Sequence, residues 1–190
     1  MKSPFLAIAL LALGLAPALA AAAETWSVDP VHSTAQFTAR HFGIVPVIGT
    51  IPIVGASVQL NSGSQIPVSA TAELDASQLD THNDNRDHDL KSDHFFDVAV
   101  TPKITFASTK IEGTDPNNFT IAGNLTMHGQ RHPIVLQARV VGSGTSPRGR
   151  RIVAYAATVT IDRTQWGMTY GPLIVGNDVD LSLNVEADAP

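Results

Sequence analysis

Apolar and polar residues alternate with a period of two along most of this chain. Such alternation is typical of strands that bury one face and leave the other in water. One further run, 47–60, is apolar on both parities and contains Gly49, Pro52 and Gly55, which predict a bulged or sharply bent strand near a sheet edge. The clearest alternating runs lie at 34–41, 68–74, 103–111, 119–127, 134–140, 153–161 and 179–185.

Residues that favour turns separate these runs, at 61–64, 113–117 and 142–149. About eight successive strands, each with one apolar and one polar face, predict an antiparallel sheet that closes into a barrel. The expected fold class is therefore all-β: an extended antiparallel β-barrel of about eight strands with one short helical lid inserted into it.

The helical insertion lies within 80–106, a stretch dense in His and Asp. Thr81 or Asn83 can cap its first turn, because a side-chain oxygen there accepts a backbone N–H that has no partner within the helix. Two aspartates follow where the helix dipole favours negative charge. Phe95 and Phe96 end the run and need an apolar surface to cover. We therefore expect a short amphipathic lid over one end of the barrel.

Residues 1–20 have the layout of a secretory signal peptide. Lys2 precedes an apolar run that is too short to span a membrane, and 18–20 form a small-x-small cleavage site. The expected organisation is 1–20 as the signal, with cleavage as late as residue 23, and 24–188 as one barrel domain. The predicted location is the periplasm or the outside of the cell, with no integral membrane span in the mature protein.

Composition narrows the classes of function. The chain of 190 residues has no cysteine, so an exported protein of this sequence depends on its core, and thiol nucleophiles and thiolate metal sites are excluded. The formal net charge is −5, and Lys and Arg do not cluster densely enough to neutralise a phosphate backbone. No nucleic-acid partner is expected.

The alternation places many small residues inside the barrel. Small residues between aliphatic ones leave an apolar channel, or they let opposite walls approach and pack solid, and composition leaves both outcomes open. A channel of this kind would suit an alkyl or isoprenoid chain. The small inward residues are Ala35, Ala39, Ala70, Ala72, Gly123, Ala138 and Ala157.

Four motifs, taken together and in this order, resemble the YceI family of bacterial periplasmic, lipocalin-like polyisoprenoid-binding proteins. The resemblance extends from Trp26 to about Val185. One departure lies two positions after Gly49, where the family usually has an aromatic residue and this chain has Ile51. The motifs are W-S-V-D-P-V-H-S at 26–33, T-H-N-D-N-R-D-H-D-L-K-S-D-H-F-F-D at 81–97 with P-K-I-T-F after it, G-N-L-T-M-H-G at 123–129 and I-D-R-T-Q-W-G-M at 161–168.

The resemblance implies a barrel that holds a long isoprenoid or related amphiphilic lipid without catalysis and without another cofactor. It links such proteins to isoprenoid transport, storage or metabolism and to stress responses. Arg86, His94 and Arg163 are the expected contacts to a polar head, because a guanidinium can bind an oxyanion through two parallel hydrogen bonds. The expected tail contacts in the barrel and lid are Phe37, Ala39, Phe42, Phe95, Phe96, Phe106, Ile121, Leu125, Leu136, Ala138, Tyr155, Val159, Trp166 and Leu183.

The residues also bear on other functions. His82, His88 and His94 recur every six residues, unlike the i, i+4 pair of a zinc-binding helix, so no metal site is predicted. Ser33 beside His32 permits a hydrolase on paper, but the G-x-S-x-G turn that would raise a nucleophile is missing. A secreted adaptor that binds a protein through the rim of a packed barrel is the remaining alternative. The sequence leaves the oligomeric state open, a homodimer included.

Overall fold

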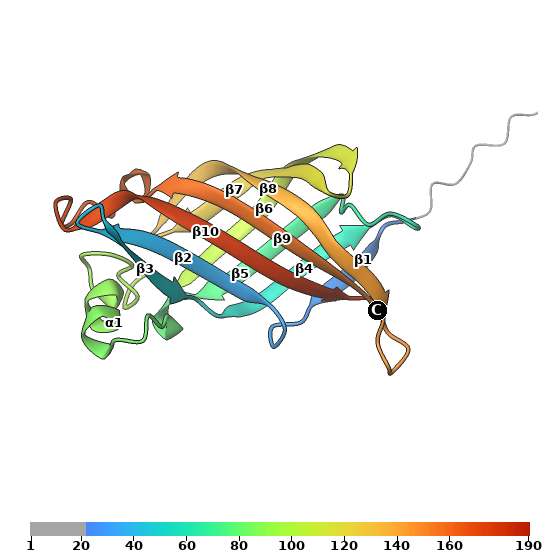
Figure 1. Ribbon diagram of the computed structural model, residues 1–190, viewed down its shortest axis with the longest axis horizontal. Coiled ribbons are helices and arrows are strands. Elements are labelled where there is room, and N and C mark those ends of the chain that lie inside the picture. Colours follow the sequence, from blue (N-terminus) through green and yellow to red (C-terminus); the bar gives the residue numbers. More distant parts are fainter. Residues whose placement is uncertain (1–21) are drawn as a thin grey trace, which may run out of the picture.

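The computed structural model describes residues 22–190, so the predicted signal peptide lies outside the described residues. Over this range the chain forms a long barrel with the α-helix at one end (Figure 1). The helical elements are η1 (Ala76–Gln78), α1 (Asp84–Lys91) and η2 (Arg163–Trp166). The strands are β1 (Glu24–Val28), β2 (Thr34–His41), β3 (Val45–Thr50), β4 (Ile53–Leu60), β5 (Ser69–Asp75), β6 (Lys103–Asp115), β7 (Asn118–Met127), β8 (Gln130–Thr145), β9 (Arg151–Asp162) and β10 (Val175–Asp188).

The strands form one antiparallel sheet that closes on itself, which confirms the predicted fold class. Their order is β1-β4-β5-β6-β7-β8-β9-β10-β2-β3, and an additional pairing of β1 with β10 closes the ring. On β10, β2 pairs along 175–184 and β1 pairs at 187–188, so β1 and β2 follow one another along the same edge. Strands β3 and β4 are likewise two parts of one long run, and the barrel wall has eight strands.

The run 47–60, predicted as a single bent strand, divides into β3 and β4 at Ile51 and Pro52. β3 pairs with β2, whereas β4 pairs with β1 and β5. Pro52 has no N–H to donate and so interrupts the ladder, while its carbonyl accepts a hydrogen bond from the Asp75 backbone N–H at 3.1 Å. The break lets one stretch of chain follow first β2 and then β1.

Two predicted turns are shorter than the sequence suggested. The first half of the segment 142–149 belongs to β8, which pairs with β9 from Gly142↔Ala154 to Thr145↔Arg151 and leaves 146–150 as the loop. The turn at 113–117 likewise contracts to two residues between β6 and β7. The glycines that predicted a loop lie in an open part of the sheet, where a Cβ on Gly142 would meet no heavy atom within 4 Å.

Helix α1 is capped as predicted but is not amphipathic. The Asn83 side chain accepts a hydrogen bond from the backbone N–H of Arg86 at 3.0 Å. None of the helical residues 84–91 is buried, and Leu90 is the single apolar residue among them. The apolar cover comes instead from Phe95 and Phe96, which lie in the turn after the helix and join the core.

Thr81 anchors this helix to the barrel wall. Its neighbour Asp80 exchanges two backbone hydrogen bonds with Thr50 at the end of β3, at 2.9 and 3.0 Å. The Thr81 hydroxyl donates to the Asp87 carboxylate at 2.5 Å and accepts from Arg86 Nε at 2.7 Å. Arg86 Nη2 donates to the Thr81 carbonyl, also at 2.7 Å. The first turn of α1 is therefore fixed to the barrel through one buried residue.

Candidate functional site

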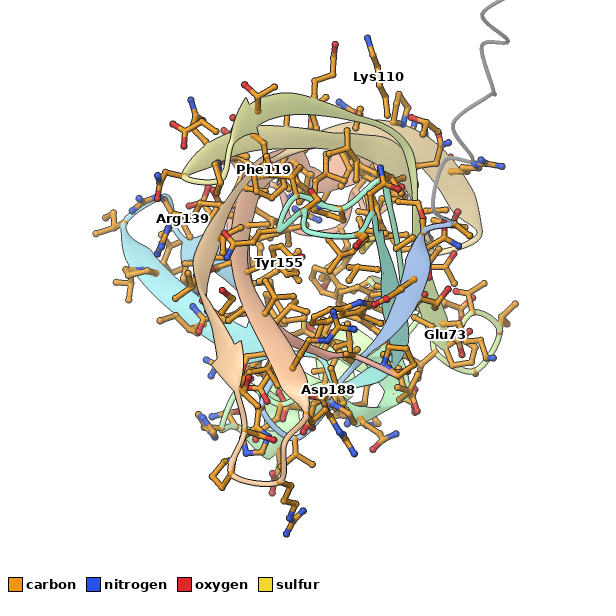
Figure 2. The ribbon with its side chains drawn as sticks, turned by 90° about the vertical axis from the view of Figure 1, so that its right-hand side faces the viewer. Glu73, Lys110, Phe119, Arg139, Tyr155 and Asp188 are labelled. Atoms are coloured by element: carbon orange, nitrogen blue, oxygen red, sulfur yellow. The ribbon has the colours of Figure 1, made fainter. Side chains whose placement is uncertain are left out.

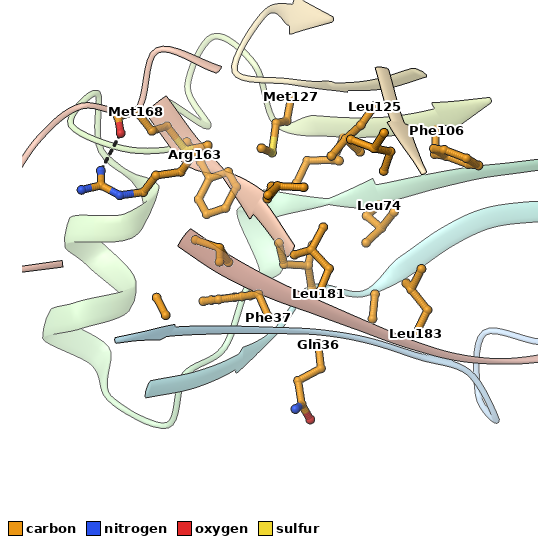
Figure 3. A pocket seen from close by; sticks show the side chains of 18 of the residues that line it. Gln36, Phe37, Leu74, Phe106, Leu125, Met127, Arg163, Met168, Leu181 and Leu183 are labelled. Carbon is orange, nitrogen blue, oxygen red and sulfur yellow. Dashed lines mark hydrogen bonds between the residues drawn. The ribbon is translucent and has the colours of Figure 1, made fainter. Parts of the chain in front are cut away.

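An apolar cavity of about 160 Å³ lies inside the half of the barrel that α1 covers (Figure 3). Gln36 and Arg163 are the polar residues at its wall, and the Gln36 side chain points away from it. An apolar cavity of about 150 Å³ in another protein stays dry and binds benzene. The barrel is therefore not packed solid. The cavity is lined by Ala35, Gln36, Phe37, Ala39, Ile51, Ala72, Leu74, Leu90, Phe95, Phe96, Ile104, Phe106, Leu125, Met127, Ile134, Leu136, Ile161, Arg163, Met168, Val175, Val179, Leu181 and Leu183.

Two phenylalanines lie flat against the cavity wall because each covers a glycine. A Cβ on Gly123 would come within 2.4 Å of Phe106 Cζ, and a Cβ on Gly49 within 2.4 Å of Phe37 Cζ. Phe37 and Gly49 are direct cross-strand partners. A larger residue at either glycine would push an aromatic ring toward the middle of the barrel, so the glycines help to keep the cavity open.

Arg163 closes the cavity near η2 without offering it a free charge. Its guanidinium donates four hydrogen bonds to carbonyl oxygens, those of Gly176 (3.0 Å), Met168 (2.5 Å), Tyr170 (2.9 Å) and Val175 (2.9 Å). Figure 3 shows the guanidinium pointing out of the cavity toward Met168, in the loop that follows η2. Burial lowers the pKa of Arg163, an effect that Asp162 partly opposes. The arginine thus holds the loop 167–174 against the start of β10.

Aromatic contacts join the lid to the same loop. The His94 ring stacks on Tyr170 with 3.9 Å between centroids, and Phe95 meets Tyr170 edge to face at 5.8 Å. The Arg163 guanidinium carbon lies 5.7 Å from the centre of the Phe95 ring. Phe95 is buried and forms part of the cavity wall. The lid end is therefore closed by contacts between two segments that belong to no strand.

The opposite half of the barrel is filled by side chains. Phe119 and Tyr155 meet edge to face at 6.5 Å, and the Tyr155 hydroxyl donates to the Gln65 carbonyl at 2.9 Å. Figure 2, a view along the barrel, shows both rings within the ring of strands. Burial raises the pKa of the Tyr155 hydroxyl above its usual range. Trp26, Leu60 and Val153 complete this packed half.

The structure places only part of the predicted tail contacts on the cavity wall. Ile121, Ala138, Tyr155 and Val159 belong to the buried core or pack against it, but they are not part of the cavity wall. The reason is that alternation reveals which face a residue occupies and not how far along the barrel it lies. The predicted residues that do line the cavity are Phe37, Ala39, Phe95, Phe96, Phe106, Leu125, Leu136 and Leu183.

Two predicted aromatic contacts lie away from the cavity. Trp166 is buried behind the wall, where its indole N–H donates to the Leu125 carbonyl at 3.2 Å. Phe42 is 61% exposed in the turn between β2 and β3, and its backbone N–H donates to the Ile174 carbonyl at 2.8 Å. Leu173, next to Ile174, is 88% exposed. The tips of the turn and the loop therefore present apolar side chains to solvent.

The predicted head-group residues do not gather at one point. Arg86 binds Thr81, and Arg163 binds the carbonyls described above. His94 stacks on Tyr170 and has its Nδ1 3.5 Å from the Asp89 carboxylate. These groups stabilise the lid and the loop, a role that no local sequence pattern distinguishes from ligand contact.

Sequence reasoning missed several cavity residues. Most lie on the inward face of strands that the alternation predicts. The alternation does not show how far along the barrel each residue lies. Met168 and Val175 come from the loop after η2 and the start of β10, and nothing in the sequence pattern marked them. The missed residues include Ile104, Met127, Ile134, Ile161, Met168, Val175, Val179 and Leu181.

A polar cluster lies outside the cavity, between β1 and β2. His32 Nδ1 is 2.9 Å from the Asp29 carboxylate, which raises the pKa of His32, and the same bond lowers the pKa of Asp29. Glu186 brings a carboxylate near them, and one ligand atom from each residue lies within 4.8 Å of the others. Ser33 Oγ accepts the Glu186 backbone N–H at 3.0 Å, so the serine and histidine of the hydrolase alternative have separate partners.

Within residues 22–190, every helix is shorter or more polar than a bilayer-crossing helix must be.

The chain has recognisable relatives. A UPF0312 protein of Enterobacter sp. (strain 638) is 30% identical over 188 residues, which cover 98% of this chain and 97% of that protein.

Two solved structures share the fold. BcnA of Burkholderia cenocepacia superposes with a TM-score of 0.73 at 19% identity and covers 84% of this chain and 98% of its own. A polyisoprenoid binding domain from Saccharophagus degradans, implicated in plant cell wall breakdown, has a TM-score of 0.62 at 15% identity, with coverages of 87% and 98%. The family model of the YceI-like domain matches residues 26–187, from the start of β1 to the end of β10, and the chain therefore belongs to the YceI-like family.

Proposed function

We propose that this protein binds the hydrocarbon tail of an isoprenoid or related lipid, without chemical conversion, in the lid half of its barrel. The observation that carries the proposal is a cavity whose inward side chains are apolar on every strand that borders it. The structural neighbour from Saccharophagus degradans, described as a polyisoprenoid binding domain, supports the same class of ligand.

Binding of this kind draws its free energy from burial of the tail. Each buried CH₂ contributes about 0.8 kcal/mol before the cost of ordering the chain. The one charged group at the wall, Arg163, already donates to four carbonyls. The polar head of a ligand would therefore lie outside the cavity, and affinity would depend on the tail more than on the head.

We further propose that the protein carries or stores its ligand outside the cytoplasm after removal of residues 1–20. The first described strand, β1, begins at Glu24, so cleavage anywhere between residues 20 and 23 would leave every described strand intact. Reversible burial of a tail in a closed barrel suits transport or storage of a molecule that is poorly soluble in water.

Replacement of Ala72 by Phe tests the binding site. Ala72 lines the cavity, so an aromatic ring there would occupy the space of the ligand. Ala122 is the matched control, because it lies on the outward face of β7 between the buried Ile121 and Gly123. Native mass spectrometry of protein from the periplasm, followed by organic extraction, should find a stoichiometric lipid in the natural sequence and in Ala122→Phe and none in Ala72→Phe. Equal lipid in both folded variants would refute the proposed site.

A secreted adaptor is the second candidate function. The observation that favours it is a group of exposed apolar side chains at the turn between β2 and β3 and at the loop before β10. Ile44, in the turn, is 75% exposed. Exposed apolar clusters on a soluble protein often mark a contact surface. A protein that carries no lipid from the periplasm and takes up no added isoprenoid would favour this function over lipid binding.

A further inference from the structure

The cavity reaches inward residues at only one end of the strands that border it. On β7 the wall residues are Leu125 and Met127, while Ile121 and Phe119, farther along the same face, lie outside the cavity. The same division occurs on β9, where only Ile161 reaches the wall. The last wall residues toward the far end are Ala72 on β5, Phe106 on β6, Leu136 on β8 and Leu183 on β10. Leu136 pairs with Ile121 and Leu183 with Ala157, so the cavity reaches farther along β8 and β10 than along β7 and β9.

Beyond the cavity the barrel holds a packed plug, which we define as Phe119, Ile121, Tyr155, Trp26 and Leu60. Each of them is at most 8% exposed, and all belong to the same buried cluster. The contacts of Phe119 with Tyr155, and of Tyr155 with the Gln65 carbonyl, tie the plug to the loop that follows β4. Gln65 in turn donates to Ser143 Oγ at 2.6 Å and links that loop to β8.

We propose that the plug makes this barrel selective for tail length, so that it buries a short isoprenoid segment and leaves the rest of a longer tail outside. The inference rests on the proposed function and specifies its ligand. A cavity of about 160 Å³ cannot enclose a tail as long as the barrel itself. Phe119 is the residue that sets the limit, because it pairs with Ala138, the next inward position after the wall residue Leu136 on β8, and meets Tyr155 edge to face.

The test measures affinity against tail length with linear isoprenols, from geraniol through farnesol and geranylgeraniol to solanesol. Displacement of the fluorescent probe phenylnaphthylamine reports binding of each alcohol to the full chain. While the tail is still entering the cavity, affinity should rise by about fourfold for each added CH₂, the fold-change that corresponds to about 0.8 kcal/mol. Once the tail reaches the plug, further length should change affinity by less than twofold per isoprene unit.

Phe119→Ala and Ile121→Ala deepen the cavity floor and should move the plateau to a longer alcohol. Val153→Ala is the matched control, because it removes core volume on the far side of Tyr155 and should leave the plateau in place. Ile121→Ala removes the smaller side chain and keeps the test available if Phe119→Ala does not fold.

The outcomes separate this inference from the proposed function. A natural sequence that binds none of the alcohols contradicts the proposed function itself. Affinity that keeps rising through solanesol overturns the length limit and leaves the function intact. A plateau that stays in place in folded Phe119→Ala or Ile121→Ala overturns the role of the plug, whereas a shift in these variants and none in Val153→Ala establishes it.

Discussion

Gly123 and Gly49 act through the aromatic rings that cover them. The space that a Cβ would need on Gly123 is already taken by Phe106 Cζ at 2.4 Å and by the Ala107 carbonyl oxygen at 2.6 Å. One of these neighbours is a flexible ring and the other is backbone. A methyl group there would therefore both turn the ring into the cavity and displace the strand.

Gly123→Ala should lower the free energy of unfolding by about 1–3 kcal/mol, the usual cost of overpacking a core. It should also weaken binding of a cavity ligand, because the displaced Phe106 ring takes up its space. Urea denaturation and ligand titration measure the two effects. Gly142→Ala is the control, since a Cβ there meets nothing within 4 Å. Equal behaviour of the two variants would contradict this account of the glycine.

Tyr155 makes stability depend on pH in the alkaline range. Burial raises its pKa in the folded state above the value of 10.0 that an unfolded chain has. The stabilisation is fully present below pH 10, because both states are then protonated, and it is lost as the pH rises toward the folded pKa. The free energy of unfolding should therefore fall by about 1.4 kcal/mol per pH unit above pH 10. Urea unfolding between pH 7 and pH 11.5 should show this slope in the natural sequence and a smaller one in Tyr155→Phe; equal slopes would contradict it.

At the level of elements, the lid owes its position to few contacts. Helix α1 buries none of residues 84–91, so its attachment depends on the hydrogen bonds of Thr81 and on the apolar turn that follows it. Local opening is easiest where few apolar contacts hold a segment. The lid is thus the part of the cavity wall that most readily separates from the barrel.

Thr81→Val keeps the shape of the side chain and removes the hydroxyl. Asp87 then keeps only the Thr81 backbone N–H as a donor, and Arg86 Nε loses its acceptor, at a cost of about 1–3 kcal/mol for a group left without a partner. We expect hydrogen exchange to accelerate in residues 84–91 while the strands keep their protection. Thr109→Val is a control, because Thr109 is exposed and its hydroxyl makes a long hydrogen bond, of 3.3 Å, to the Ala122 carbonyl. Exchange that stays unchanged in α1 would show that the helix is held by other contacts.

The elements were largely predictable from alternation. β2, β5, β7, β9 and β10 have one apolar face and appear where the pattern indicated them. The differences have local causes. Pro52 interrupts a run whose apolar residues are continuous. The glycines at the end of β8 favour a loop in the sequence, but pairing with β9 holds them in the strand. Phe95 and Phe96 make the lid look amphipathic in the sequence, although both lie in the turn after the helix.

On the scale of the whole molecule, sequence reasoning gave the barrel and its apolar interior but not the division of that interior. Tyr155 and Leu136 both occupy inward positions of alternating runs, yet Tyr155 belongs to the plug and Leu136 lines the cavity. The difference arises from the stagger of strands around the barrel and from the loop at Gln65 that caps one end. Such features join residues far apart in the chain, so no local pattern contains them.

The pairing that closes the ring has a consequence for how the chain folds. Ser27 pairs with Asp188 and Val28 with Ala187, so the first strand meets the last one across nearly the whole described chain. Contacts of such large sequence separation slow folding, because the entropy of closing the loop must be lost before they form. A chain emerging from the ribosome cannot complete its barrel until its final strand has been synthesised. Until then β1 lacks the β10 partner that closes the ring, and the hydrogen bonds at that edge of the sheet stay unmade.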